Sequence, residues 1–167
     1  KVANTVGHYD AFRKDLDMIQ SVKLLTPDID YSNNATNEIY KEDANILIRK
    51  ISCDVLYIDP PYNSRQYSDA YHLLENLAEW KKPEVVGVAK KMDRSHIKSS
   101  YCLKNATQAF EDLIRNANCK HILLSYNNTG DSKDGRSNAR IADNDILRIL
   151  KNKGEVEIFE RDYKAFT

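Results

Sequence analysis

The chain has 167 residues, and its 25 Lys and Arg residues balance its 25 Asp and Glu residues, so its formal net charge at pH 7 is +0. This balance excludes a whole-molecule field that attracts nucleic acid or a membrane, so any anionic partner must bind a local patch. With 41% hydrophobic and 30% charged residues, the composition also excludes a largely disordered chain and predicts one globular domain.

Apolar runs, cysteines and glycines narrow the class of protein further. No apolar run approaches the roughly 20 residues that a membrane span needs, and no signal peptide is recognisable, so we expect a soluble, cytoplasmic protein. Cys53, Cys102 and Cys119 form no CxxC pair, and the four histidines lack metal-ligand spacing. We therefore expect reduced structural thiols and no metal site. Five glycines without a GxG or P-loop pattern argue against a self-contained dinucleotide or P-loop site.

Residues 1–36 are predicted to form a lead-in segment, and the hydrophobic pattern becomes regular only after them. Glu38 to Lys41 alternates as a short strand does, and apolar residues over 44–51 recur at helical spacing. Val55 to Ile58 is a continuous apolar run that a pair of prolines ends, which predicts a strand buried on both faces.

The rest of the chain continues this alternation of helices and strands. A helix is predicted over 71–78 and ends before Lys81-Lys82-Pro83, and a long loop follows over 85–101. An amphipathic helix over 106–117, a buried strand over 122–126 and a surface loop over 127–138 come next. The last predicted elements are a helix capped by Asp143 and stopped by Gly154, and a strand over 156–166. This order predicts an α/β layer structure with mainly parallel strands over residues 37–167.

Asp59-Pro60-Pro61-Tyr62 stands at the carboxyl end of the first buried strand, where open α/β sheets bind their ligands. Each proline fixes its own φ and keeps the preceding residue extended, so the Pro60 carbonyl is left without a helical partner. A carboxylate, a fixed carbonyl and an aromatic ring together suit an amino group on a planar heterocycle. The alternative is that the prolines only end the strand while Tyr62 packs.

This tetrapeptide resembles the catalytic motif of amino-methyltransferases, which methylate exocyclic amines of adenine or cytosine. Three further segments, residues 4–9 (NTVGHY), 71–75 (YHLLE) and 124–127 (LSYN), together with residues 59–67 (DPPYNSRQY), resemble a bacterial adenine-specific DNA methyltransferase of a restriction-modification system. The similarity runs from Asn4 to about Tyr163. It implies a Rossmann-like fold that depends on S-adenosylmethionine, with a mostly parallel sheet that is incomplete in this chain.

The resemblance also implies roles for the motif. Asp59 and the Pro60 carbonyl would accept hydrogen bonds from the adenine amino group, beside Pro61, and Tyr62 would stack on the flipped base. Two acceptors favour a pyramidal nitrogen and stabilise positive charge as it attacks a sulfonium methyl group. The target amine lies inside a duplex, so the base must be extruded first. Asp43 is implied to bind the adenine amine of S-adenosylmethionine, and its alternative role is a helix N-cap.

Candidate DNA contacts follow the motif and continue in the predicted long loop. Seven Lys and Arg residues against two acidic residues over 81–104 give a local excess of +5, which suits phosphate contacts, although such a run is also typical of a solvated loop. The predicted DNA-binding residues are Asn63, Arg65, Gln66, Tyr67, Lys90, Lys91 and Arg94. Ser125-Tyr126-Asn127 either lines the same pocket or, for Tyr126, belongs to the core.

The Phe-x-Gly-x-Gly cofactor segment of this family is absent from the sequence. We therefore expect the chain to be the carboxyl-side portion of a longer enzyme, with double-stranded DNA, the missing amino-terminal half and a cognate restriction endonuclease as partners. Two alternatives stay open at this point. One is a non-catalytic DNA-binding fragment, and the other is a methyltransferase that acts on RNA or on a protein amide.

Overall fold

The computed structural model describes residues 25–26, 28, 36–87, 91–127 and 140–161, and the chain divides into two compact units. The first unit comes from residues 1–41 and 67–98, and the second from residues 42–66 and 99–167. No helix in the described part of the chain has the length and apolar character that a membrane span requires.

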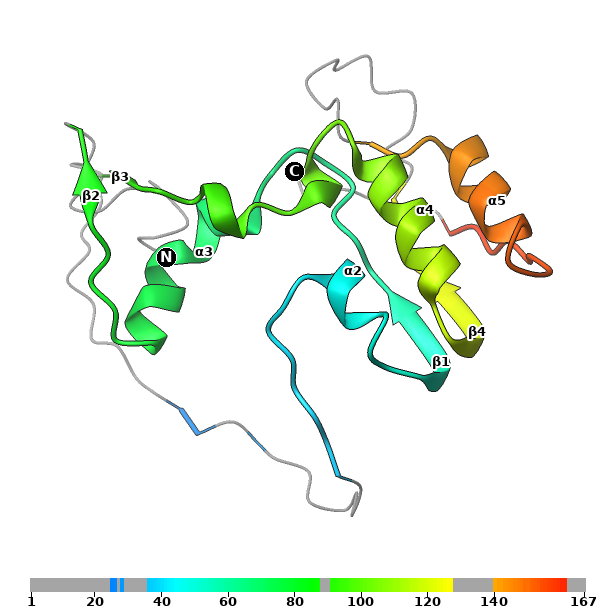
Figure 1. Cartoon of the computed structure of the whole chain (residues 1–167), viewed down its shortest axis with the longest axis horizontal. Coiled ribbons are helices and arrows are strands. Elements are labelled where there is room, and N and C mark those ends of the chain that lie inside the picture. Colours follow the sequence, from blue (N-terminus) through cyan, green and yellow to red (C-terminus); the bar gives the residue numbers. More distant parts are fainter. Residues whose placement is uncertain (1–24, 27, 29–35, 88–90, 128–139, 162–167) are drawn as a thin grey trace. The chain divides into compact units, whose positions relative to one another are not determined.

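The second unit is built around two parallel strands, β1 (Cys53–Ile58) and β4 (Cys119–Leu124). In their register Cys53 pairs with Cys119 and Ile58 pairs with Leu124, as Figure 1 shows for the two ribbons side by side. The backbone N–H of Ser125 donates to the Ile58 carbonyl at 2.9 Å, which extends the ladder by one bond. The predicted α/β class with a parallel sheet is therefore confirmed at this level.

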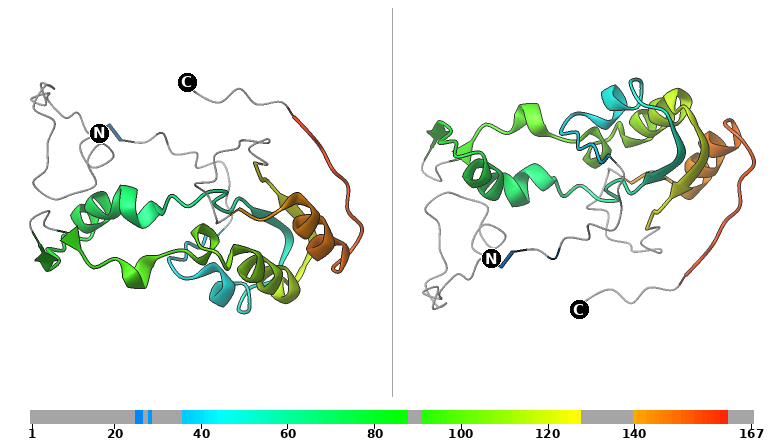
Figure 2. Two further views of the ribbon diagram at one scale, coloured as in Figure 1. Left: turned by 90° about the horizontal axis from the view of Figure 1, so that it is seen from above. Right: turned by 90° about the horizontal axis from the view of Figure 1, so that it is seen from below.

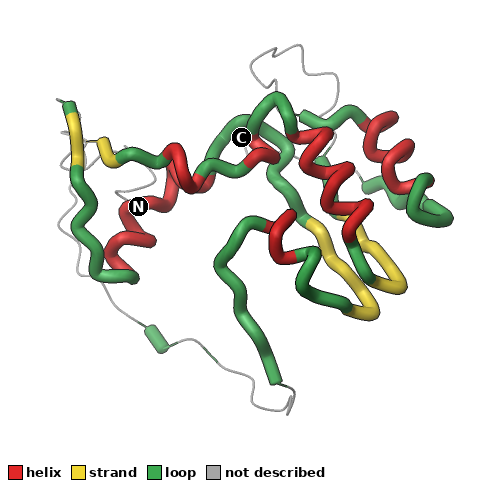
Figure 3. The backbone as a smooth tube through the Cα atoms, in the orientation of Figure 1, coloured by secondary structure: helices red, strands yellow, loops and turns green. Residues whose placement is uncertain are grey.

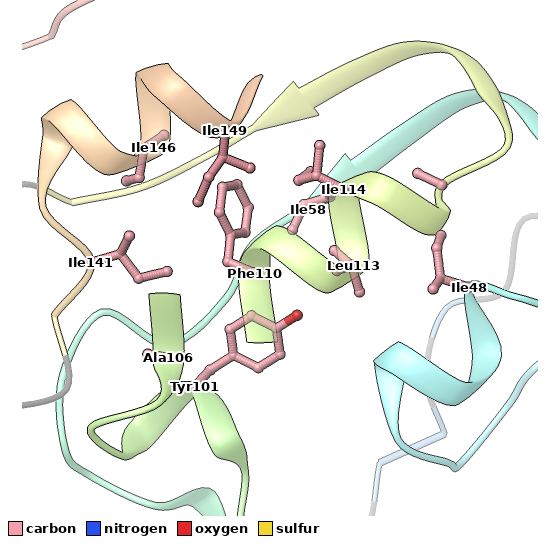
Figure 4. Close-up of a cluster of buried hydrophobic side chains, with 11 residues drawn as sticks. Ile48, Ile58, Tyr101, Ala106, Phe110, Leu113, Ile114, Ile141, Ile146 and Ile149 are labelled. Atoms are coloured by element: carbon pink, nitrogen blue, oxygen red, sulfur yellow. The ribbon is translucent and has the colours of Figure 1, made fainter. Parts of the chain in front are cut away.

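Helix α4 (Ala106–Asn116) covers one face of this sheet and contacts three neighbours, which are α2 (Ala44–Leu47), the 3-10 turn η2 (Ser100–Cys102) and α5 (Asp143–Lys151). Both further views show α4 beside the two strands (Figure 2). Phe110 is fully buried at the centre of the core. Around it lie the side chains of Ile48, Ile58, Tyr101, Ala106, Leu113, Ile114, Ala117, Ile141, Ile146 and Ile149 (Figure 4).

The two faces of the β1–β4 pair differ in exposure. Leu56 and Ile122 pack against the core beneath α4. Val55, Tyr57 and Leu123 are 58%, 59% and 57% exposed. Successive strand residues point to opposite faces, so the second face of the sheet presents an apolar surface. The prediction of a strand buried on both faces is wrong for β1, because the described residues cover only one face.

The first unit contains α3 (Tyr67–Ala78), the two-residue strands β2 (Val85–Val86) and β3 (Lys91–Met92), and the 3-10 turn η1 (Ser95–Ile97). The predicted loop over 85–101 thus carries a short antiparallel ladder and two 3-10 turns. The predicted helical stripe is present, but Tyr71, Leu74 and Leu77 are 41%, 47% and 61% exposed.

Helix α3 ends at Ala78, as predicted, and the chain leaves the helix through a residue in the left-handed conformation. Trp80 has φ of 53°. The N–H of Trp80 donates to the Leu77 carbonyl at 3.1 Å, and the N–H of Lys81 donates to the Asn76 carbonyl at 2.7 Å. This pair of bonds is the Schellman arrangement, which normally places Gly at the left-handed position. A tryptophan there gave no sequence signal for the helix end.

Two predicted strands are absent from the described residues. Glu38 to Lys41 is loop (Figure 3), and Ile39 is 96% exposed. Lys41 instead contacts Glu75 and Glu79 of α3 at 2.7 and 2.5 Å. Residues 156–161 are also without regular structure, and residues 162–167 lie outside the described part. Apolar alternation alone cannot form a strand, because its N–H and C=O groups need a neighbouring strand to pair with.

The start of α5 is shifted by one residue from the prediction. Ala142 occupies the N-cap position, and Asp143 is the first helical residue. Asp143 and Asp145 lie in the first turn, where carboxylates interact favourably with the helix dipole. The predicted surface loop lies almost wholly outside the described residues.

Candidate functional site

Asp59-Pro60-Pro61-Tyr62 leaves the carboxyl end of β1 directly. Pro60 is buried and Pro61 is half-buried, so the middle of the motif is held against the protein. Asp59 is exposed and the Tyr62 ring is 38% exposed. The carboxylate and the ring are thus both accessible to a ligand, while the prolines between them fix the backbone.

The end of β4 lies beside the start of this motif. Because β1 and β4 are parallel, their carboxyl ends meet at one edge, and the bond from Ser125 to Ile58 joins them there. The Tyr126 ring packs against the core and its hydroxyl oxygen accepts a hydrogen bond from the Ile141 N–H at 3.0 Å. Burial raises the pKa of this phenol. Of the two alternatives for Tyr126, the described contacts favour the core.

The residues after the motif form a tight turn. The Asn63 side-chain oxygen accepts a hydrogen bond from the Arg65 N–H at 2.9 Å, which is the geometry of an Asx-turn. The Cys102 thiol donates to the Arg65 carbonyl at 3.4 Å. Arg65 itself is exposed, so its guanidinium faces solvent rather than the core.

Gln66 differs from the other candidate DNA contacts because its side chain is only 7% exposed. Its amide nitrogen donates to the Ser99 carbonyl at 3.0 Å, and its amide oxygen accepts from the Ser99 N–H at 2.8 Å. Both ends of the amide are therefore engaged by the backbone of one residue, 33 positions along the chain.

Asp43 is the N-cap of α2, as one of the two alternatives predicted. Its Oδ1 accepts from the N–H groups of Asn45 and Ile46 at 2.9 and 3.2 Å. Both bonds use one carboxylate oxygen, so the cap leaves the other oxygen of an exposed side chain for further bonding. The cap and a ligand contact are compatible at this position.

A polar network behind Asp43 ties α2 to α4 and η2. The Tyr101 hydroxyl donates to Asn45 Oδ1 at 2.9 Å, and the Asn45 amide donates to Asp112 at 2.7 Å and to the Ala109 carbonyl at 2.8 Å. Burial, together with the nearby carboxylates of Asp43 and Asp112, raises the pKa of Tyr101 well above its usual range. Hydrogen bonds from Arg49 and Asn45 lower the pKa of Asp112.

The remaining candidate DNA contacts belong to the first unit. The Tyr67 ring is 69% exposed and lies 5.8 Å from the Tyr71 ring. Lys91 is exposed on β3, whereas the Arg94 side chain is largely buried and its Nε donates to Asp69 at 2.8 Å. Lys90 lies outside the described residues.

The first unit also holds a buried histidine that the site does not use. His72 is 3% exposed, and burial, followed by the charge of Arg94, lowers its pKa. No group of three or more His, Cys, Asp and Glu side chains among the described residues is placed to hold a metal ion.

Sequence reasoning missed Asn45, Ser99 and Tyr101. Tyr101 and Ser99 fall in a stretch that was predicted to be loop, and Asn45 is a single polar residue beside an apolar stripe. Each gains its role from a partner far away in sequence, such as the 56 positions between Asn45 and Tyr101. No local pattern could have found them.

Comparison with known protein families shows the family of this chain. Residues 1–128 match the family described as D12 class N6 adenine-specific DNA methyltransferase. The chain belongs to this family. The matched range includes β1, Asp59-Pro60-Pro61-Tyr62 and β4.

Named relatives agree with this assignment. The chain is 41% identical to modification methylase StsI of Streptococcus sanguinis over 99% of its own length and 25% of the relative's. It is 41% identical to type II methyltransferase M.FokI of Planomicrobium okeanokoites over 98% of its length and 24% of the relative's. It is 36% identical to type II methyltransferase M.NlaIII of Neisseria lactamica over 99% of its own length and 47% of the relative's. The chain thus spans a quarter to a half of these relatives. No solved structure matches it.

Proposed function

We propose that this protein transfers a methyl group from S-adenosylmethionine to the exocyclic amine of a flipped adenine in double-stranded DNA, on a Rossmann-like fold. The observation that carries the proposal is the exposed Asp59 carboxylate and accessible Tyr62 ring on either side of two fixed prolines, at the carboxyl end of a parallel strand. Family membership makes a methyl donor and a DNA substrate the natural ligands of such a site.

In this proposal Asp59 and the Pro60 carbonyl accept the two hydrogens of the target amine. The adenine amine is a weak nucleophile because its lone pair is delocalised into the ring. Two acceptors draw its hydrogens out of the ring plane and stabilise the positive charge that develops on nitrogen as it attacks a methyl group. Asp59 is the stronger acceptor because it carries a charge.

Tyr62 supplies the stacking face. A base that leaves the duplex loses its stacking neighbours at a cost of a few kcal/mol. A ring that is 38% exposed can cover one face of the base and offset part of that cost.

Asp43 is the residue that we assign to the methyl donor. Its exposed carboxylate has one oxygen beyond those used in the α2 cap, which suits an amino or hydroxyl donor of a nucleoside. The donor, when bound, supplies an electrophilic sulfonium methyl group. The residue's own part is to accept a hydrogen bond while it caps α2.

Exposed cationic and aromatic residues are the proposed DNA contacts. Arg65, Tyr67 and Lys91 have accessible side chains, and Asn63 and Lys90 remain candidates from the sequence. Arg94 is assigned a weaker part because Asp69 already engages it. We further propose a cognate restriction endonuclease as the biological counterpart, on the basis of relatives named type II methyltransferases. Action in the cytoplasm stays a prediction.

The test is the Asp59→Ala variant of the full-length protein. We expect methyl incorporation into duplex DNA to fall at least about a hundredfold, since Asp59 acts on the transition state. Donor and duplex affinity should change little. Asp54→Ala is the matched control, because Asp54 is an exposed carboxylate within β1, the strand that precedes Asp59, and it pairs with Lys120. Duplex binding by the wild type without donor binding would contradict the proposal and favour a non-catalytic DNA-binding role.

A further inference from the structure

The segment that carries the motif is fixed at two points. At its start, the Ile58 carbonyl accepts the Ser125 N–H at 2.9 Å. At its end, the buried Gln66 amide forms two hydrogen bonds with the Ser99 backbone at 3.0 and 2.8 Å. The residues between these points, 59–65, contain the exposed Asp59, Tyr62 and Arg65 side chains.

We propose that Gln66 is a positioning residue, which holds the Asp59-Pro60-Pro61-Tyr62 segment in place by clamping its far end to Ser99. This inference rests on the proposed methyl transfer. It replaces the DNA-contact role expected for Gln66, because its amide has no exposed edge from which to reach a base or phosphate.

The two hydrogen bonds between the Gln66 amide and the Ser99 backbone resemble a pair of hydrogen bonds between two backbone segments. A side-chain amide carries an NH2 donor and a carbonyl acceptor side by side on one planar group, and here the NH2 group donates to the Ser99 C=O while the carbonyl accepts from the Ser99 N–H. Two bonds to one residue fix orientation as well as distance. Gln66 is 7% exposed and Ser99 is half-buried, so loss of the amide would leave the Ser99 N–H and C=O without these partners at a position partly shielded from water.

The residue that receives the clamp is itself held firmly. Ser99 caps η2 through the bond from the Tyr101 N–H to its Oγ at 3.3 Å. Tyr101 is 7% exposed in the core, and its hydroxyl reaches Asn45 of α2. Asn45 in turn donates its N–H to Asp43 Oδ1 at 2.9 Å. A continuous set of contacts therefore leads from the motif segment to the helix that bears Asp43.

This arrangement has a consequence for catalysis. The amine acceptors and the donor-binding carboxylate must be held in register, since a displacement of about 1 Å can cost a hundredfold in rate. The prolines stiffen the segment from within, and Gln66 fixes the end that they do not reach. Substitution should therefore act on turnover more than on duplex affinity.

The experiment compares three variants of the full-length protein with the wild type. Gln66→Met keeps the length of the side chain but removes both hydrogen bonds. Gln66→Glu keeps the acceptor but cannot donate to the Ser99 carbonyl while it is ionised. Gln108→Met is the control, because Gln108 is an exposed glutamine of α4 that takes no part in the clamp. For each we would measure kcat and KM for a duplex substrate, the pH profile of kcat, and the thermal midpoint.

We expect kcat of Gln66→Met to fall about tenfold to a hundredfold, with KM for the duplex changed less than threefold. Gln108→Met should stay within threefold of the wild type in both. Gln66→Glu should regain turnover relative to the wild type as the pH falls, since a protonated carboxyl has a donor and an acceptor as the amide does. This recovery would keep the test decisive if Gln66→Met fails to fold.

Four outcomes would overturn the inference. A Gln66→Met variant with wild-type kcat and a raised KM would make Gln66 a DNA contact. A loss of kcat that only follows a lower thermal midpoint, without pH-dependent recovery in Gln66→Glu, would make the clamp purely structural. An inactive wild type would remove the proposed function and the inference together, whereas an active wild type with equally active Gln66 variants would remove the inference alone.

Discussion

Tyr57 and Leu123 stand opposite each other in the parallel register of β1 and β4, and their side chains are 59% and 57% exposed. Val55 lies on the same face and is 58% exposed. The exposed His121 lies opposite Val55 on this face. Leaving the three apolar side chains in water forgoes about 25 cal/mol of favourable free energy per Å² of apolar surface. Parallel strands are normally buried on both faces, so this surface has consequences for the chain in solution.

The first prediction concerns this face. We expect the 167-residue chain to self-associate and to bind a hydrophobic dye, and the double substitution Tyr57→Thr with Leu123→Thr to weaken both. Threonine keeps strand propensity and the original side chains are exposed, so the free energy of unfolding should change by less than about 1 kcal/mol. Sedimentation and dye fluorescence would measure the effect.

Leu103→Thr is the matched control for that experiment. Leu103 is 42% exposed, is the C-cap of η2 and belongs to neither strand. Equal dye binding by the double variant and the wild type would show that the sheet face is not the associating surface.

The second prediction concerns the core. Phe110 is fully buried in the cluster formed by α4, α5 and β1. Phe110→Ala should lower the free energy of unfolding by about 3–5 kcal/mol through lost transfer free energy and a residual cavity. Because a domain of this size is marginally stable, this loss should leave much of the chain unfolded at 37 °C. Phe110→Leu fills most of the volume and should cost clearly less, and equal thermal midpoints for the two variants would contradict the assignment.

The elements that sequence analysis predicted well are those with a strong local signal. β1 contains the predicted apolar run Val55 to Ile58, and α4 forms from apolar residues at helical spacing. β4 contains the apolar Ile122 to Leu124, but it runs from Cys119 to Leu124 rather than over the predicted residues 122–126. The placement of Asp59 and Tyr62 at a strand end follows from the prolines, which no strand can continue. These features depend on neighbours in the chain, so a single sequence contains them.

The features that sequence analysis missed depend on distant partners. Glu38 to Lys41 has strand-like alternation, but no strand in the part of the chain that the structure describes pairs with it. Burial of one face of β1 is decided by α4, which lies about 50 residues further along the chain. The Gln66 side chain carries no sign that Ser99 will bind it, and its polar character favoured a surface contact instead. Pairings of this kind are properties of the folded chain.

The third prediction is an alkaline loss of stability due to Tyr101. Burial raises the pKa of Tyr101. In the unfolded chain a tyrosine has a pKa of about 10, so above this pH the unfolded state loses the phenol proton while the folded state keeps it. The unfolded state then binds fewer protons, and the free energy of unfolding falls as pH rises above about 10, by up to about 1.4 kcal/mol per pH unit for each such group. Below that pH the contribution is fully present.

Substitution separates the contributions of the two buried tyrosines. Tyr101→Phe should weaken the alkaline dependence, and it should cost about 1 kcal/mol at neutral pH through the lost bond to Asn45. Burial also raises the pKa of Tyr126, so Tyr126→Phe should remove a second part of the alkaline loss of stability. The double variant should remove more of this loss than either single variant. Urea titrations between pH 8 and about 11 would measure this, and an unchanged slope in Tyr101→Phe would contradict the buried hydroxyl.

The last prediction concerns Tyr62, whose ring is 38% exposed beside the fixed prolines. If the ring stacks on an extruded base, the interaction needs a π face and not the hydroxyl, so Tyr62→Phe and Tyr62→Trp should keep most of the activity of the full-length protein. Tyr62→Ala should lose about 1–3 kcal/mol of base capture. Fluorescence of 2-aminopurine at the target position reports extrusion directly, because the probe brightens when it leaves the stack. Tyr57→Ala serves as the control, since Tyr57 is an exposed tyrosine on the open sheet face rather than at the strand end. Wild-type fluorescence enhancement in Tyr62→Ala would show that the ring does not hold the base, and a loss in Tyr62→Phe equal to that in Tyr62→Ala would move the role from the ring to its hydroxyl.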